Sequence, residues 1–323
     1  MRSKVGDASF TMTFSFLFIR RCIKRDALKR KSIMLSTKEK WINWNEEGLL
    51  PGPDETEQSF LERAHYCLNL KQQIAQALGS AIPFQEEDLA NQSFFQPIWE
   101  KTDALYGMKP SWVPLFFSNV KLAPWHGGCA WIFQLSETEP LSALLQLRKN
   151  FAYQQKYLGL YDRNELIAHE LVHVGRMAYQ EPQFEEFFAY QTSDSWFRRL
   201  FGPLIQSSYE SLLFVFSLFF VLILQLWIPQ EPFAQIAMFL PILLMAYALG
   251  RLAFRWVQFN QAKQKLFQLF QNKEKAWHVL YRLTDREIKT VGKLSPEKIL
   301  AYFEERQEDS FRLKVLWLTR FSK

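Results

Sequence analysis

The chain has 323 residues, of which 48% are hydrophobic and 16% aromatic, with only 12 glycines and 14 prolines. This length and composition exclude a disordered or collagenous chain and allow one large or two modest domains. The net charge of +6 is misleading, because residues 1–33 hold nine Lys/Arg and two Asp/Glu and the rest of the chain has a charge of −1. Nucleic-acid binding is therefore not predicted. The three scattered cysteines (Cys22, Cys67 and Cys129) exclude a disulfide framework and a zinc ribbon.

Residues 1–33 form a basic N-terminal extension. Its apolar stretch, residues 10–19, is too short to span a bilayer. The basic residues 20–25 follow this stretch, where a signal peptide would have a cleavage site with small residues. Two interpretations stay open: the extension is part of the protein, or it is not translated because synthesis begins at Met34.

The next part of the chain is predicted to be mostly helical. Residues 37–53 are expected to form an exposed lead-in that ends in a Pro-Gly-Pro turn. Residues 55–78 carry apolar side chains at helical spacing and predict a helix that ends before Gly79. Residues 86–106 predict a second helical stretch.

Strand signals precede the chemistry-bearing segment. Residues 112–119 and 129–135 are short, rich in aromatic and β-branched side chains, and bounded by Pro and Gly. The turn of residues 124–128 separates them, and residues 140–147 fit either a strand or a helix. A small sheet is therefore expected directly before residue 162.

The segment from 162 to 190 carries the sequence His-Glu-x-x-His. Asp162 and Glu165 have the spacing of a capping box, so a helix should begin near residue 163. On that helix His169 and His173 lie one turn apart and can bind one metal ion. Glu170 can take a proton from a metal-bound water, whose pKa the ion lowers. The alternative is a surface helix with two ordinary histidines.

This segment resembles the gluzincin metallopeptidases over about 30 residues. The resemblance implies zinc as the cofactor, a peptide or protein as the substrate, and a third ligand from a Glu that precedes a small residue by three positions. Glu186 and Ala189 match that pattern. Glu185 is followed at that offset by Phe188, so it is expected to be a solvated charge. The order of segments also resembles that of a family of chlamydial membrane proteins, which implies no mechanism.

The third ligand sets a condition on the helices. Because a helix rises about 1.5 Å per residue, Glu186 reaches the two imidazoles only if the first helix ends near Met177 or Ala178. Pro182 would then open the second helix. A helix that continued through Pro182 would exclude Glu186 as a ligand.

Further residues are expected to support the site. Tyr190 stands where some gluzincins have an acidic residue, which implies that its phenol supports a histidine ligand or stabilises the oxyanion. Glu165 is a rival supporter, and Tyr179 and Arg176 are further oxyanion candidates. In the resembled family an edge strand pairs with the substrate backbone; residues 129–135 are the candidate, with plain core as the alternative.

Two apolar runs, residues 212–228 and 233–253, predict a transmembrane hairpin, with a buried soluble hairpin as the alternative. The loop between them lacks Lys and Arg, whereas basic residues flank both ends. The positive-inside rule therefore places the head and both termini in the cytoplasm. Residues 254–323 carry 15 Lys/Arg and eight Asp/Glu, and would lie beside the anionic inner leaflet as a helical cap, a membrane contact or a partner-docking module.

The sequence thus predicts a mostly helical α+β protein. It comprises the extension, a gluzincin-like domain over residues 34–205, a transmembrane hairpin over 206–253 and a basic helical cytoplasmic region over 254–323. The predicted function is that of a zinc metallopeptidase in the inner membrane, with membrane lipid as a further partner. A catalytically inactive membrane scaffold with a metallopeptidase-like fold is the main alternative, and a metal hydrolase for non-peptide amides is a third.

Overall fold

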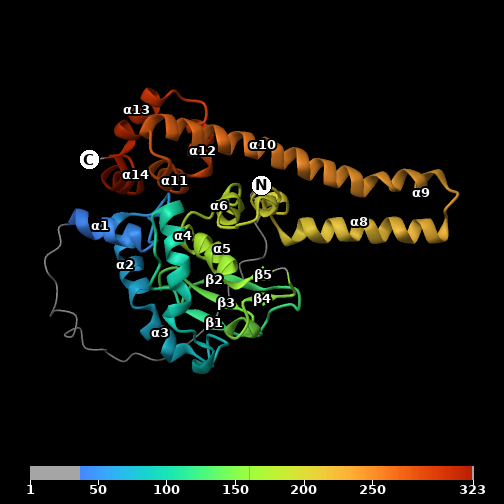
Figure 1. Ribbon diagram of the computed structural model, residues 1–323, viewed down its shortest axis with the longest axis horizontal. Helices are drawn as coiled ribbons and strands as arrows, with labels where there is room; N and C mark the ends of the chain where they lie inside the picture. The colour runs from blue at the N-terminus through green and yellow to red at the C-terminus, as the bar shows by residue number, and fades with distance from the viewer. Residues whose placement is uncertain (1–36, 160, 322–323) are drawn as a thin grey trace.

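A computed structural model of the protein describes residues 37–159 and 161–321. The extension of residues 1–33 and the candidate start at Met34 lie outside the described residues. The described chain is mostly helical, with a small sheet in a head from which a long helical hairpin projects (Figure 1). The expected α+β class is thereby confirmed.

The sheet has three strands, β1 (Leu115–Phe117), β2 (Gly128–Phe133) and β3 (Ser142–Leu147). Their order is β1-β3-β2, with β1 parallel and β2 antiparallel to β3. Residues 140–147, which by sequence fit either a strand or a helix, therefore contain the central strand β3. This strand is buried along its whole length. Helix α5 (Arg163–Gly175) packs on β2 and β3, so β2 is an edge strand beside that helix.

The predicted exposed lead-in is wrong. Its first half is a helix, α1 (Thr37–Glu46), and both indoles of that helix, Trp41 and Trp44, are buried. The two tryptophans lie three positions apart and so share one helix face. Trp41 packs edge-on against Phe311 near the C-terminus, with ring centroids 5.4 Å apart. This segment is therefore part of the core, where the start of the described chain packs against a residue near its end.

The two predicted helices of the N-terminal part are shorter than expected. The first is divided at Asn69 into α2 (Glu57–Leu68) and α3 (Leu70–Ala77). The Asn69 side chain donates to the carbonyl of His65, and such side-chain bonds compete with the helical ladder. In the second stretch only α4 (Gln96–Tyr106) is α-helical, after two short 3-10 turns.

The hairpin consists of α8 (Ser208–Trp227), α9 (Pro232–Ala237) and α10 (Phe239–Phe270). Two helical segments, Tyr209–Trp227 and Pro232–Phe270, are long and apolar enough to cross a membrane, and few of their side chains are buried inside the protein. Pro241 cannot donate to the carbonyl of Ala237, which accounts for the break between α9 and α10.

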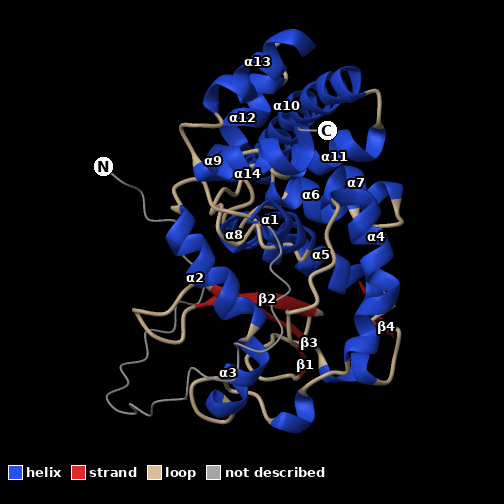
Figure 2. Cartoon of the chain, turned by 90° about the vertical axis from the view of Figure 1, so that its left-hand side faces the viewer, coloured by secondary structure: helices blue, strands red, loops and turns tan. Residues whose placement is uncertain are grey.

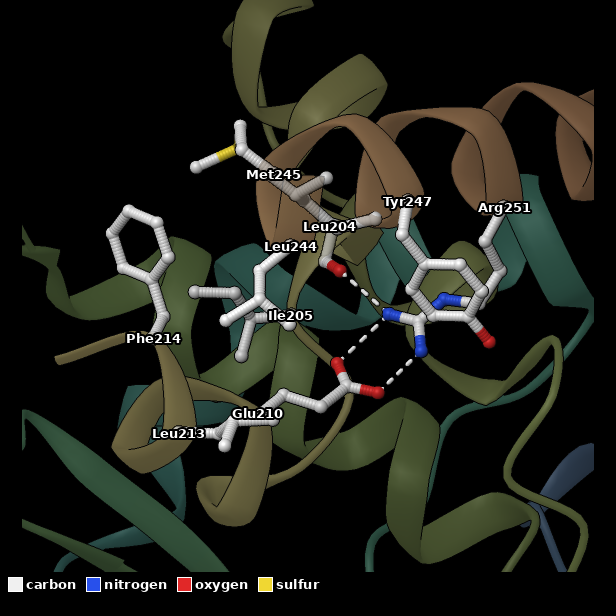
Figure 3. A pocket seen from close by; sticks show the side chains of 10 residues that line it. Leu204, Ile205, Glu210, Leu213, Phe214, Leu244, Met245, Tyr247 and Arg251 are labelled. Carbon is white, nitrogen blue, oxygen red and sulfur yellow. Dashed lines mark hydrogen bonds and ion pairs between the residues drawn. The ribbon is translucent and has the colours of Figure 1, made fainter. Parts of the chain in front are cut away.

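A cavity of about 210 Å³ lies between α8 and α10 at the base of the hairpin (Figure 3). Most of the side chains that line it are apolar. At one end Arg251 of α10 binds both carboxylate oxygens of Glu210 of α8, and it also donates to the carbonyl of Leu204 at 3.0 Å. This ion pair joins the two helices at the end nearest the head.

The C-terminal helices are α11 (Lys273–Tyr281), α12 (Asp285–Val291), α13 (Pro296–Arg306) and α14 (Phe311–Leu316). Thr284 and Glu287 form a capping box at the start of α12, and Pro296 is the first residue of α13. Figure 2 shows these helices gathered at one end of the molecule and the strands at the other, with α5 and α6 (Glu185–Gln191) between them. The expected boundary at residue 254 falls inside α10.

Candidate metal centre

Helix α5 begins where the sequence predicts. The Asp162 carboxylate accepts hydrogen bonds from the backbone N–H groups of Asn164 (2.9 Å) and Glu165 (3.1 Å), which caps the helix. The expected second half of the capping box is replaced by an ion pair. Glu165 Oε1 lies 2.6 Å from Nη1 of Arg198, on the short helix α7 (Trp196–Phe201). Glu165 therefore ties α7 to the start of α5.

Glu186 can reach the two imidazoles only if the first ligand helix ends near Met177 or Ala178, and the turn between the two helices meets this condition. Helix α5 ends at Gly175, before Met177, and the chain from 176 to 184 is not helical. Pro182 lies in this turn and does not open α6, whose N-cap residue is Phe184. Gly175 permits a close approach, because a Cβ there would lie 2.3 Å from Oη of Tyr281.

Three side chains converge from the two helices. His169 Nε2 lies 3.3 Å from His173 Nε2, and each of these atoms lies 3.6 Å from a carboxylate oxygen of Glu186. All three side chains are half-buried. A tetrahedral zinc with Zn–N bonds of about 2.0–2.1 Å would space its ligands roughly 3.3 Å apart, so the three donors could hold one ion.

Glu185 does not have the solvated position that the sequence predicted. Its Oε1 lies 2.8 Å from Nδ1 of His173. Such a carboxylate fixes the ring and favours the tautomer in which Nδ1 carries the proton and Nε2 offers its lone pair. Adjacent glutamates on α6 thus have different positions: Glu186 faces both imidazoles and Glu185 supports one of them.

Glu170 is buried between α5 and the edge strand. The backbone N–H of Ala130 on β2 donates to its Oε2 at 2.8 Å, which leaves Oε1 without a hydrogen bond from this N–H. Burial raises the pKa of Glu170 above its ordinary value, and the neighbouring carboxylate of Glu186 adds to this. The carboxylate is therefore held in place by a strand that also borders the candidate site.

Tyr190 lies beside His169, with ring centroids 4.7 Å apart in an edge-to-face arrangement. Its ring also fills the space next to Gly202, where a Cβ would lie 2.3 Å from the ring. Burial, followed by the negative charge of Glu186, raises the pKa of Tyr190 to about 12. The structure thus brings Tyr190 beside His169; its role stays a prediction.

The other oxyanion candidates are bound elsewhere. Arg176 is fully buried and its Nη1 donates to the carbonyls of Tyr281 and Leu283. The phenol of Tyr179 donates to the carbonyl of Arg282 at 2.9 Å. Both side chains therefore join the turn after α5 to the C-terminal helices, and the expectation that they stabilise an oxyanion is wrong.

Three glutamates and two histidines lie together at the site. Burial lowers the pKa of His169 well below its ordinary value. Burial also lowers that of His173, but the carboxylates of Glu186 and Glu185 outweigh this effect and raise the pKa to about 10, so a metal ion that binds Nε2 must displace a proton from it. With Glu170, three carboxylates surround two imidazoles, which favours a cation between them.

Comparison of the chain with models of protein families, with curated proteins and with solved structures finds no match. A function for this chain is therefore inferred from the residues of the site. Sequence reasoning missed the contact of Glu185 with His173, although the adjacent glutamates were the available signal. It also missed Asp285, whose carboxylate accepts hydrogen bonds from the turn before α6. The two segments are more than 100 residues apart in the sequence, and no local pattern indicates this contact.

Proposed function

We propose that the chain is a membrane-anchored zinc metallopeptidase of the gluzincin type, with its head in the cytoplasm. The observation that carries the proposal is the placement of His169, His173 and Glu186, whose donor atoms lie within 4.8 Å of one another. Glu170, next to the first histidine in the chain, supplies the base that such a site needs.

Each residue has a distinct part in the proposed reaction. When bound, zinc would supply Lewis acidity, which lowers the pKa of water and polarises a peptide carbonyl. Glu170 would accept the proton of the attacking water on the oxygen that Ala130 leaves free, and would pass it to the leaving amine. The phenol of Tyr190 would donate a hydrogen bond to the developing oxyanion.

The edge strand suits an extended peptide substrate. In an antiparallel pair, alternate residues direct their N–H and C=O groups away from the partner strand. The bond from Ala130 N–H to Glu170 shows that Ala130 is one of these residues, and the alternation adds Gly128 and Ile132. A substrate added to this edge would run past the metal centre. The resemblance to gluzincins implies the same mode of binding.

The hairpin supports the membrane part of the proposal. Its two segments have the length and composition of membrane spans, and their apolar side chains are largely exposed. The loop that joins them carries no Lys or Arg, whereas Arg198, Arg199 and Arg255 flank the base. The positive-inside rule then places the head in the cytoplasm.

The proposal is tested by zinc analysis of the purified full-length protein together with the Glu170→Gln variant. We expect about one zinc per chain in both proteins, because Glu170 is not a ligand. We expect cleavage of a quenched fluorescent peptide library to fall by about 10²–10⁴-fold in the variant, since its amide cannot accept the proton. The exposed Glu137→Gln change is the matched control. A wild-type protein that binds no zinc would refute the proposal.

Glu185 provides a graded test of the same site. Replacing Glu185 by glutamine should weaken zinc binding by about 10–100-fold, because the carboxylate that holds Nδ1 of His173 is lost while the ligands stay. Competition with a chromogenic chelator measures the change. Equal zinc affinity in the variant and the wild type would mean that Glu185 does not support the ligand.

The inactive scaffold is the second candidate. The basic C-terminal region favours the scaffold. Its helices pack on the turn between the two ligand helices, and the same region could also bind a partner protein. A His169→Ala/His173→Ala double variant that keeps the cellular function of the protein would support the scaffold over the enzyme.

A further inference from the structure

We propose that the head lies directly on the lipid bilayer, through exposed apolar side chains on three loops and one short helix beside the metal centre. The inference rests on the membrane anchor of the proposed function and does not require activity. We call these side chains the interfacial face. They and their exposed fractions are Trp125 (66%), Tyr153 (85%), Leu158 (61%), Trp196 (67%) and Phe197 (57%).

Hydrogen bonds and ring contacts show that these segments are neighbours. The phenol of Tyr157 on β4 (Lys156–Tyr157) donates to the carbonyl of Pro124 at 2.8 Å, which joins the β4–β5 turn to the turn that carries Trp125. The ring of Tyr161 on β5 (Tyr161–Asp162) lies 6.0 Å from the guanidinium carbon of Arg198 on α7. The turn that carries Trp125, the β4–β5 hairpin that carries Leu158 and helix α7 are therefore neighbours.

The hairpin fixes the direction in which this face points. The indole N–H of Trp256 on α10 donates to the carbonyl of Leu200 on α7 at 2.9 Å, and Arg251 donates to that of Leu204. These contacts tie α7 and the following turn to α10. In Figure 1 β4 and β5 lie on the side of the head toward which the hairpin extends. If the hairpin crosses a bilayer, these loops therefore meet its surface.

The composition of the face fits a bilayer interface better than water. Tryptophan and tyrosine concentrate at the level of lipid headgroups, where the ring is partly buried and the polar atom stays hydrated. The exposed lysines Lys149 and Lys156 adjoin the face and suit anionic headgroups. Continuity with the membrane-length helices favours lipid over a soluble protein as the occupant of this surface.

This placement limits the substrate. Arg198 on α7 is ion-paired with Glu165, which precedes the ligand His169 by one helical turn. The metal centre would thus be close to the bilayer surface and would receive extended segments that emerge directly from it.

Spin labels on the full-length protein in nanodiscs of phosphatidylcholine and phosphatidylserine test the inference. The native cysteines are replaced by alanine, and zinc content confirms that the site is intact. Single labels are then placed by Leu158→Cys and Trp196→Cys, with Leu89→Cys near β1 as the aqueous control and Phe219→Cys on α8 as the membrane control. Accessibility to oxygen and to a water-soluble nickel chelate reports immersion in lipid.

We expect the labels at 158 and 196 to be several-fold more accessible to oxygen than to nickel, like the label at 219 and unlike the label at 89. Aqueous labels at 158 and 196 with a lipid-immersed label at 219 would overturn the inference and leave the anchor intact. An aqueous label at 219 would overturn the anchor itself. If neither reagent reaches the labels at 158 and 196, the proposed contact of the interfacial face with lipid is also overturned. A protein partner or a second copy of the chain would then cover this face.

Discussion

Replacement of Glu186 by alanine is expected to abolish stoichiometric zinc binding while the protein stays folded. The change removes the carboxylate whose oxygens lie 3.6 Å from both imidazole Nε2 atoms. Two histidines alone fall short of the three protein ligands that catalytic zinc sites use. The loss of affinity should exceed the about 10–100-fold effect expected for the supporting residue Glu185.

Two measurements establish this order. Chelator competition should rank zinc affinity as wild type, then Glu185→Gln, then Glu186→Ala. A ligand that binds only the folded protein stabilises it, so zinc should raise the melting temperature of the wild type and leave that of Glu186→Ala unchanged. Wild-type zinc affinity in Glu186→Ala would show that the third ligand has been assigned wrongly.

The sequence predicted the parts of the fold that local patterns determine. Asp162 caps a helix because its carboxylate reaches backbone N–H groups two and three residues ahead, and this needs no tertiary contact. The same holds for the start of α12 at Thr284 and for the two long apolar helices. The two histidines share a helix face for the same local reason.

Other features depend on contacts between distant residues. The sequence predicts that the two indoles of α1 belong to an exposed lead-in. They are buried, because Phe311 near the C-terminus packs against Trp41. Glu165 has the spacing of a capping box, but Arg198, 33 residues later, binds its carboxylate. In both cases a tertiary partner overrides a local preference, and a single sequence does not show such partners.

The metal centre combines both kinds of information. Spacing within α5 indicates His169 and His173 as candidate ligands, and the resemblance to gluzincins implies Glu186 through its Glu-x-x-Ala pattern. The position of Glu185 depends on how α6 is rotated about its axis against α5. That rotation is set by the buried side chains of α6, Phe187 and Phe188, and by the turn before it. The C-terminal helices hold this turn.

Removal of the Asp285 carboxylate is therefore expected to weaken the metal centre from the far end of the chain. Asp285 Oδ2 accepts a hydrogen bond from the N–H of Gln183 at 2.9 Å, and Oδ1 accepts one from that of Phe184 at 3.3 Å. Its own N–H donates to Glu181 at 2.6 Å. Asp285→Ala leaves both N–H groups without their partner, which should lower the free energy of unfolding by about 1–3 kcal/mol.

Zinc affinity, as a second measurement, distinguishes an effect of Asp285 on the orientation of the ligands from an effect on overall stability. Because Phe184 is the N-cap residue of α6, loosening its N–H should let Glu185 and Glu186 move, and zinc affinity should fall at temperatures where the variant is fully folded. Asp285→Asn keeps one acceptor oxygen and should show a smaller loss, whereas Asp309→Ala, at an exposed site, should show none. Reduced stability with unchanged zinc affinity would mean that Asp285 holds the C-terminal helices in place without orienting the ligands. Reduced affinity in a fully folded Asp285→Ala protein would make the C-terminal helices part of what builds the metal centre.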